Sequence, residues 1–329
     1  MGFINTLHPD RYHGFSKKPP YFEGWYYKLV SADEKIRMAI IPGVYLAPDQ
    51  DNHHCFVQVF DSNAEAVRYH RYPYAAFQAS RDAFEVQVGP NVFTRNAIKL
   101  AIDDEMGQFS GSLGFTGLNP WPVRTFSPGA MGWFAWVPMM ECYHGVVSMN
   151  HRIEGCLVLD GQELDFSGGR GYIEKDWGKQ FPSAWIWGQS NHFETPGVSL
   201  MVSVAVIPWL GRSFAGFIIG LLHEGRIYRF ATYNRSQIER LSIYDAEVSL
   251  VVINPKHRLR IRASRVEGGL LQAPTMVEMD RRIIETLNAQ LEVSFENHKG
   301  EVIFSGTGRH AGLETVGDLD RLIRMAQKG

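Results

Sequence analysis

The sequence predicts an all-β protein in which two antiparallel β-barrels follow one another, with a short helix at the C-terminus. Three observations support this fold class. Apolar and polar side chains alternate along many short segments, turn-forming residues separate the segments, and helical periodicity is found only near the end of the chain. The length of 329 residues exceeds what one hydrophobic core usually serves, which favours two units of about 165 residues each.

The alternation is clearest in residues 198–206, where valine and leucine fall on one face and serine, methionine and alanine on the other. Residues 98–102, 258–263 and 291–296 repeat the pattern, which is typical of antiparallel strands with one buried face. Turn residues such as Asp160-Gly161 predict hairpins. Because open sheet edges promote aggregation, we expect the strands to close into barrels.

The glycine-rich segment 168–171 is the expected connection between the units, giving a first barrel over residues 1–168 and a second over residues 169–329. Both halves run from an aromatic strand through an apolar strand ending in Ile-Pro to a hairpin, which is a weak internal repeat. Asp318 is placed to cap the C-terminal helix. The helix would direct four apolar side chains to the core: Leu319, Leu322, Ile323 and Ala326.

Charge and cysteine content exclude several classes of protein. The 33 basic and 35 acidic residues leave no positive excess for binding nucleic acid. Cys55, Cys142 and Cys156 are odd in number and far apart, which argues against disulfides and cysteine zinc sites and favours a cytoplasmic location.

Membrane contact is expected to be transient at most. There is no secretory signal and no apolar run of the ~18 residues that a membrane helix needs. The basic side of the C-terminal helix, with Arg321, Arg324 and Lys328, is a weak candidate for contact with a membrane surface.

Motifs for cofactors, metals and serine hydrolysis are not found. The chain has no GxGxxG opening a helix, no GxxxxGK[ST] and no GxSxG. Its histidines form no HxH or HExxH pattern that would present two metal ligands on one face. We therefore expect neither a cofactor nor a metal ion.

Tryptophan is unusually concentrated. Seven of the eight tryptophans lie between residues 121 and 209, and the eighth, Trp25, lies in the aromatic run 21–27. In a strand, Trp185 and Trp187 share one face, as do Trp25 and Tyr27. Two interpretations remain open: an aromatic ligand cavity, or a barrel core sealed by large side chains.

Three acidic residues, Glu23, Glu174 and Asp176, lie among these rings. Burial against aromatic side chains raises the pKa of a carboxyl group, so that it can act as a general acid near neutral pH. The alternative is that Glu23, Glu174 and Lys175 form paired charges or anchor backbone amides. In an extended segment Glu174 and Asp176 share one face, and Lys175 points to the other.

Four segments carry a resemblance to a known family: Phe22–Lys28, Tyr172–Gly178, Trp185–Asn191 and Ala311–Glu314. In these the chain resembles the tocopherol cyclase family, although Asp176 stands where we would expect an asparagine in the plant enzymes. The resemblance implies two lipocalin-like barrels, shared with carotenoid hydratases and related proteins. It also implies cofactor-free closure of a prenylated benzoquinol to a chromanol.

The residues fit such chemistry. Protonating a trisubstituted alkene gives a tertiary cation, which aromatic faces stabilise while the phenol oxygen attacks. We expect Glu174 or Glu23 as the acid, with Asp176 third, and Gln189 and Asn191 on a quinol hydroxyl. The expected cavity wall consists of Trp25, Tyr26, Trp177, Trp185 and Trp187.

Two other functions fit the same sequence. A lipocalin-like barrel can serve as a carrier that holds a hydrophobic isoprenoid without changing it. A hydratase would admit water to the same cation and release an alcohol. In all three cases the partner is a hydrophobic small molecule.

Overall fold

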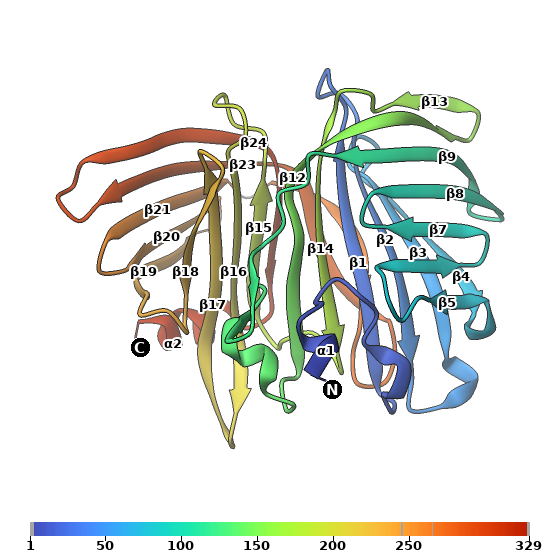
Figure 1. Cartoon of the computed structure of the whole chain (residues 1–329), viewed down its shortest axis with the longest axis horizontal. Helices are drawn as coiled ribbons and strands as arrows, with labels where there is room; N and C mark the ends of the chain where they lie inside the picture. The colour runs from blue at the N-terminus through green and yellow to red at the C-terminus, as the bar shows by residue number, and fades with distance from the viewer. Residues whose placement is uncertain (1–2, 245, 265, 328–329) are drawn as a thin grey trace. The chain divides into compact units, whose positions relative to one another are not determined.

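The computed structural model describes residues 3–244, 246–264 and 266–327, so that Lys328 lies outside the described residues. It is nearly all β, with two large antiparallel sheets and a short C-terminal helix (Figure 1), which confirms the predicted fold class. Contacts divide the chain into two compact units. The first contains the residues up to Phe181 and the segment Leu270–Arg282, and the second contains Pro182–Gly269 and the residues from Ile283 onward.

The first sheet has the strand order β4-β3-β2-β1-β14-β12-β9-β8-β7-β6-β5, with β13 paired to β12. Its strands are β1 (Tyr21–Val30), β2 (Arg37–Leu46), β3 (His54–Asp61), β4 (Ala66–Pro73), β5 (Phe77–Ala79), β6 (Glu85–Val88), β7 (Asn91–Thr94), β8 (Ala97–Asp104), β9 (Gly107–Thr116), β12 (Cys142–Leu159), β13 (Gln162–Asp165) and β14 (Arg170–Gly178). The same unit has short helical turns and a small hairpin: α1 (Phe3–Thr6), η1 (Gly14–Ser16), η2 (Gln50–Asn52), η3 (Tyr74–Ala76), η4 (Gly132–Trp136), β10 (Val123–Arg124) and β11 (Ser127–Pro128).

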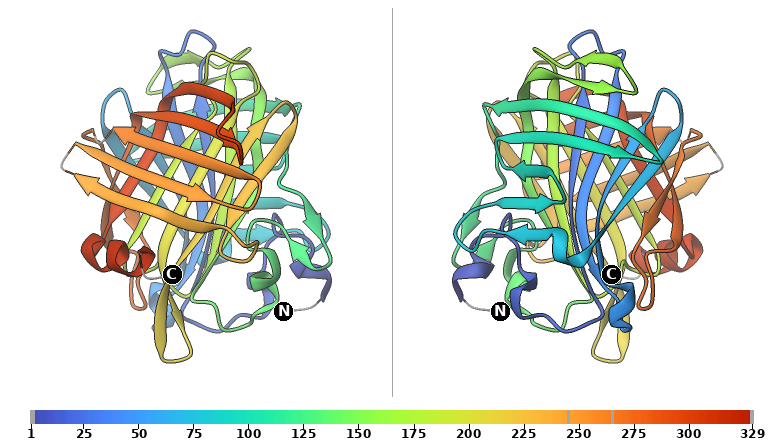
Figure 2. Two further views of the ribbon diagram at one scale, coloured as in Figure 1. Left: turned by 90° about the vertical axis from the view of Figure 1, so that its left-hand side faces the viewer. Right: turned by 90° about the vertical axis from the view of Figure 1, so that its right-hand side faces the viewer.

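This sheet curls around on itself (Figure 2), and side chains join its edge strand β4 to β7 and β8, near the opposite edge. The Asn91 side-chain amide of β7 donates a hydrogen bond of 3.3 Å to the Tyr72 hydroxyl of β4. In the same way His70 of β4 lies 2.8 Å from the carboxylate of Asp104 at the end of β8. The outer strand β4 therefore meets the strands that follow β6, as barrel closure requires.

The second sheet has the order β18-β17-β16-β15-β24-β23-β21-β20-β19. Its strands are β15 (Trp185–Ser190), β16 (Ser199–Trp209), β17 (Arg212–His223), β18 (Arg226–Ala231), β19 (Gln237–Tyr244), β20 (Glu247–Ile253), β21 (His257–Ser264), β23 (Arg281–Asn297) and β24 (Val302–Val316). The short strand β22 (Gly269–Ala273) and the helix α2 (Leu319–Ala326) complete the chain.

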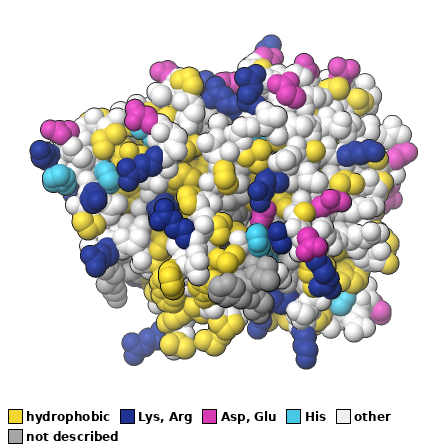
Figure 3. Space-filling view, viewed as in Figure 1, with side chains coloured by type: hydrophobic (Ala, Val, Ile, Leu, Met, Phe, Trp, Pro, Cys, Tyr) yellow, Lys and Arg dark blue, Asp and Glu magenta, His cyan; other side chains and the backbone are white. Residues whose placement is uncertain are grey.

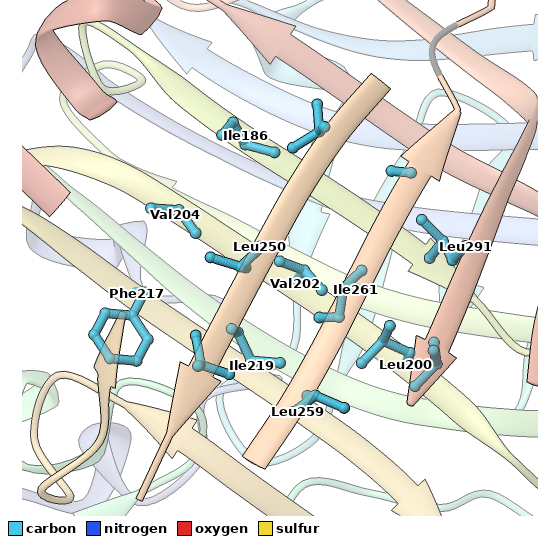
Figure 4. Packing of buried hydrophobic residues seen from close by; sticks show 14 of the residues in the cluster. Ile186, Leu200, Val202, Val204, Phe217, Ile219, Leu250, Leu259, Ile261 and Leu291 are labelled. Atoms are coloured by element: carbon cyan, nitrogen blue, oxygen red, sulfur yellow. The ribbon is translucent and has the colours of Figure 1, made fainter. Parts of the chain in front are cut away.

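Strands from all around the second sheet share one apolar core (Figure 4). The alternation seen in residues 198–206 is confirmed, because Leu200, Val202 and Val204 of β16 point into this core. The helix α2 also packs on it through Leu322. The predicted cap is present, since the Asp318 carboxylate accepts a hydrogen bond from a backbone N–H in the first turn.

The boundary between the units differs from the one expected at 168/169. Strand β14 pairs with both β1 and β12, so it belongs to the first unit, and the division falls after Phe181. In the glycine-rich segment 168–171, Gly168 takes a positive φ of 76° in a turn, and Arg170 and Gly171 begin β14. Glycine marked a tight turn here, not a linker between barrels.

Candidate active site

Strand β14 sorts the charged residues onto two faces, as the alternation predicted. Its pairing with β1 places Glu23 beside Trp177, and Trp25 beside Lys175, on one face. On the other face Tyr26 lies beside Glu174. The predicted acids therefore form two separate clusters.

The Glu23 cluster consists of Glu23, Lys175, His13 and Tyr21. The ammonium of Lys175 lies 2.5 Å from a carboxylate oxygen of Glu23, and both side chains are fully buried. The backbone N–H of His13 donates to both oxygens of the carboxylate, at 3.0 and 2.9 Å, and the Tyr21 hydroxyl also donates to it. Every oxygen of Glu23 is thus engaged inside the protein.

These partners decide the charge of Glu23. Burial raises its pKa, but the charge of Lys175 and the contacts with His13 outweigh burial and leave the pKa lowered. The expectation that aromatic walls keep Glu23 protonated is therefore wrong. The alternative weighed in the sequence, a paired charge, is what the structure shows for Glu23.

The aromatic residues around this cluster hold the N-terminal segment. The Trp25 indole donates to the carbonyl of Asp10 at 3.0 Å, and the Lys175 ammonium donates to the carbonyl of Pro9 at 3.2 Å. Trp177 stacks on the ring of His13 with centroids 4.6 Å apart. The Lys175 ammonium lies 4.4 Å from the centre of the Trp177 ring, close enough for cation–π attraction. Trp25 and Trp177 therefore enclose a buried ion pair and a stretch of chain.

The His144 cluster consists of His144, Tyr172, Glu174 and Asp176, and it lies on the opposite face of β14. Strand β12 supplies His144, whose register partner is Asp176. Its Nδ1 lies 2.9 Å from Oδ1 of Asp176, and its Nε2 lies 3.8 Å from Oε2 of Glu174. The Tyr172 hydroxyl donates a short hydrogen bond of 2.5 Å to Glu174 Oε2. This cluster joins two of the three predicted acids through a histidine.

The carboxylates of the His144 cluster favour the protonated form of His144. Burial lowers the pKa of His144, but the carboxylates of Asp176 and Glu174 act against it and raise the pKa to about 9. His144 is therefore an imidazolium at neutral pH, and its Nδ1–H donates to Asp176. Within the described part of the chain, its Nε2 is buried and has no hydrogen-bond partner. Burial and Glu174 together raise the pKa of Tyr172 well above its ordinary value, so the phenol stays protonated.

The same three side chains also form a possible donor set for a metal ion. One ligand atom from each of His144, Glu174 and Asp176 lies within 4.8 Å of the others, a spacing that a divalent cation can bridge. Sequence motifs do not reveal this group, because motifs such as HxH and HExxH place the ligands close together in the chain. His144 comes from a neighbouring strand, and only the register of β12 and β14 brings it to the acids.

The predicted residues of the second unit lie on β15 and just after it. Trp185, Trp187 and Gln189 are buried and share the face opposite Ile186, which points into the apolar core. The Trp185 indole donates to a Glu314 carboxylate oxygen at 2.5 Å. The predicted shared face is thus present. Glu314 belongs to a segment that carries the family resemblance, but its contact with Trp185 was not predicted.

Asn191 is buried just beyond the end of β15, and the structure places it outside the strand that carries the other three. A small apolar cavity of about 20 Å³ lies in the core of this unit. Eleven residues line it: Ile186, Gly188, Val202, Val204, Leu241, Val248, Leu250, Ile261, Ala263, Leu291 and Leu313. It has room for roughly one water molecule, whereas ligand sites usually measure about 300 Å³ or more. It is not a substrate site.

Residues 116–317 match a family model described as tocopherol cyclase-like. The chain belongs to the tocopherol cyclase-like family. The match covers most of the chain and includes the whole His144 cluster, but not Glu23. This confirms the resemblance found in the sequence.

The curated relatives include the chloroplastic tocopherol cyclase of Zea mays, which is 28% identical over 208 residues. That alignment covers 59% of this chain and 43% of the maize protein, so it spans less than half of the relative. Among solved structures, a putative AttH from Nitrosomonas europaea has a TM-score of 0.52 at 15% identity, covering 90% of this chain and 92% of that one. CghA has a TM-score of 0.56 at 11% identity, covering 91% and 89%. These two likenesses concern the fold.

Proposed function

We propose that this protein closes a prenylated benzoquinol to a chromanol and that the His144 cluster supplies the proton. The observation that carries the proposal is the imidazolium of His144, which donates to Asp176 and directs a buried Nε2, without a hydrogen bond among the described residues, toward Glu174 at 3.8 Å. Membership of the tocopherol cyclase-like family supports the class of substrate.

In the proposed reaction Glu174 is the general acid and His144 reloads it. His144 first passes its Nε2 proton to the Glu174 carboxylate, 3.8 Å away. The alkene electron pair then takes this proton from the resulting carboxyl group, which forms a C–H bond and a tertiary cation. The phenol oxygen then attacks the cation, forms the C–O bond and closes the ring. The phenol proton returns to the cluster, so atoms and charge balance without an external reagent.

The neighbouring residues have supporting parts. The ring of Tyr26, beside Glu174 in the sheet, would stabilise the cation by cation–π attraction. The Tyr172 hydroxyl holds the carboxyl group of Glu174 in place. Asp176 keeps His144 charged and fixes its orientation. Tyr172 and Glu174 are buried, which limits access of water that would otherwise trap the cation as an alcohol.

The test is turnover of a geranylgeranyl-substituted methylbenzoquinol under reducing conditions, with the chromanol measured by mass spectrometry. We expect Glu174→Gln to lower the rate about 100-fold or more, the usual effect of losing a general acid, with substrate affinity retained. His144→Gln should also lower the rate, because the acid is no longer reloaded. Glu154→Gln is the matched control, since its side chain lies on β12 and is 56% exposed.

Other outcomes would contradict the proposal. Labelled water oxygen in the product would indicate a hydratase, and tight binding without product would indicate a carrier. Loss of activity with a chelator, restored by a divalent cation, would show that His144, Glu174 and Asp176 act through a metal ion.

A further inference from the structure

The segment 117–140, which we term the aromatic loop, exposes large apolar side chains. It connects β9 to β12 and contains the hairpin β10–β11 and the turn η4, drawn in green in Figure 1. Phe126 is 88% exposed, more than any other large apolar side chain of the described residues, and Met139 is 70% exposed. Trp133 and Val123 are 46% and 42% exposed. Hydrophobic side chains also gather on this part of the surface in Figure 3.

The loop is held in shape by bonds that leave these side chains outside. The Trp136 indole donates to the carbonyl of Thr125 at 2.8 Å, next to Phe126 at the hairpin tip. The Tyr143 hydroxyl donates to the carbonyl of Val137 at 2.5 Å. Trp121 anchors the start of the loop, because its side chain is only 2% exposed. The exposure of Phe126 is therefore built into the fold.

The charge of the aromatic loop favours a lipid surface over a protein as its binding partner. The 24 residues of the aromatic loop contain no aspartate or glutamate, and the one charged residue is Arg124. Arg124 is exposed and lies two residues from Phe126 in the same hairpin. An apolar tip beside a cation suits the boundary of a bilayer with anionic headgroups, and tryptophan is favoured at that boundary. Protein interfaces, in contrast, usually surround their apolar centre with a rim of polar side chains.

We propose that the aromatic loop docks onto the surface of a lipid bilayer that carries anionic headgroups, with Phe126 and Met139 entering the apolar region. This interaction surface goes beyond the proposed function and stands without it. A lipid-soluble substrate would give the docking a use, because such a substrate resides in the bilayer.

The C-terminal helix, which the sequence suggested for membrane contact, is less suited to it. Leu322 and Ala326 of α2 are buried in the core of the second unit. The helix therefore turns apolar side chains inward, whereas an interfacial helix needs them for the membrane.

The test is flotation of the full chain with vesicles of phosphatidylcholine and phosphatidylglycerol. We expect the double variant Phe126→Ser/Met139→Ser to bind the vesicles at least about tenfold more weakly than the wild type. The reason is that each apolar side chain that enters the bilayer contributes substantially to the free energy of transfer. The matched control is Val277→Ser/Val302→Ser, which removes side chains that are 62% and 61% exposed elsewhere and should bind as the wild type does. Equal thermal midpoints of the variants establish that folding is unchanged.

Two further measurements locate the contact. Arg124→Gln should bind vesicles of pure phosphatidylcholine as the wild type does, but should gain less from added phosphatidylglycerol. Lipids with brominated acyl chains should quench part of the tryptophan emission of the wild type. This quenched part should be absent in Trp133→Phe. Three results would overturn the proposal: wild type that stays in the aqueous fraction, equal binding by both double variants, or a wild-type dimer that Phe126→Ser/Met139→Ser converts to a monomer.

Discussion

Raising the pH should destabilise the wild-type protein in a way that replacement of His144 abolishes. The pKa of His144 in the folded protein, about 9, is above its ordinary value of 6.5. The folded state therefore binds this proton more tightly than the unfolded state does. The resulting stabilisation is complete below pH 6.5 and is lost as the pH rises through 9.

The size of the effect follows from the two values. Their separation of about 2.5, at about 1.4 kcal/mol for each pH unit, gives about 3 kcal/mol of free energy of unfolding. The side chain is only 11% exposed, so solvent screens the interaction little. In Asp176→Asn the nearest carboxylate is gone, and the pH-dependent contribution of His144 should shrink.

The measurement is urea unfolding of the wild type and of His144→Asn at a series of pH values. His13, His54, His151 and His257 have lowered pKa values and titrate on the acid side in both proteins, so the difference between the two curves isolates His144. Parallel curves between pH 6.5 and 9 would refute the reasoning. So would an NMR titration of the His144 ring with a midpoint near 6.5.

Three further predictions concern the stability of the first unit, and urea unfolding measures each. A Cβ at Gly171 would lie 2.2 Å from Nε2 of His151, so Gly171→Ala should cost about 1–3 kcal/mol. Gly114→Ala, whose nearest heavy atom is 3.9 Å away, should change stability by less than about 0.5 kcal/mol, and equal effects would argue against the clash. Burial lowers the pKa of His151 to about 3, so the contribution of the neutral ring to the free energy of unfolding is complete above pH 6.5 and is lost as the pH falls toward 3. His151→Gln should therefore make the free energy of unfolding depend less on pH between 6.5 and 3. Lys175→Met should cost about 3–5 kcal/mol, because Glu23 is left charged and buried, and adding Glu23→Gln should recover part of the loss. A double variant as unstable as the sum of the single ones would contradict this pairing.

The sequence was informative wherever a property depends on neighbours along the chain. The alternation over residues 198–206 predicted β16 because the side-chain period of a strand is local. The same period placed Glu174 and Asp176 on one face of β14 and Lys175 on the other. These predictions needed no knowledge of which strands pair.

Properties that depend on pairing between distant strands could not be predicted. Glu23 and Lys175 are 152 positions apart, and only the register of β1 and β14 brings them into contact. The charge of Lys175 reverses the pKa shift that burial alone would give Glu23. His144 was likewise recognisable as a histidine, but its contact with Asp176 follows from the pairing of β12 with β14.

The return of residues 270–282 to the first unit has a consequence for folding during synthesis. The Tyr45 hydroxyl of β2 donates to the carbonyl of Thr275, and the Gln58 side chain of β3 bonds both backbone groups of Gln272. A ribosome must therefore produce seven strands of the second sheet, β15 to β21, before the first barrel can obtain these bonds. The two barrels are successive in sequence, but the earlier one is completed only after most of the later one has been made.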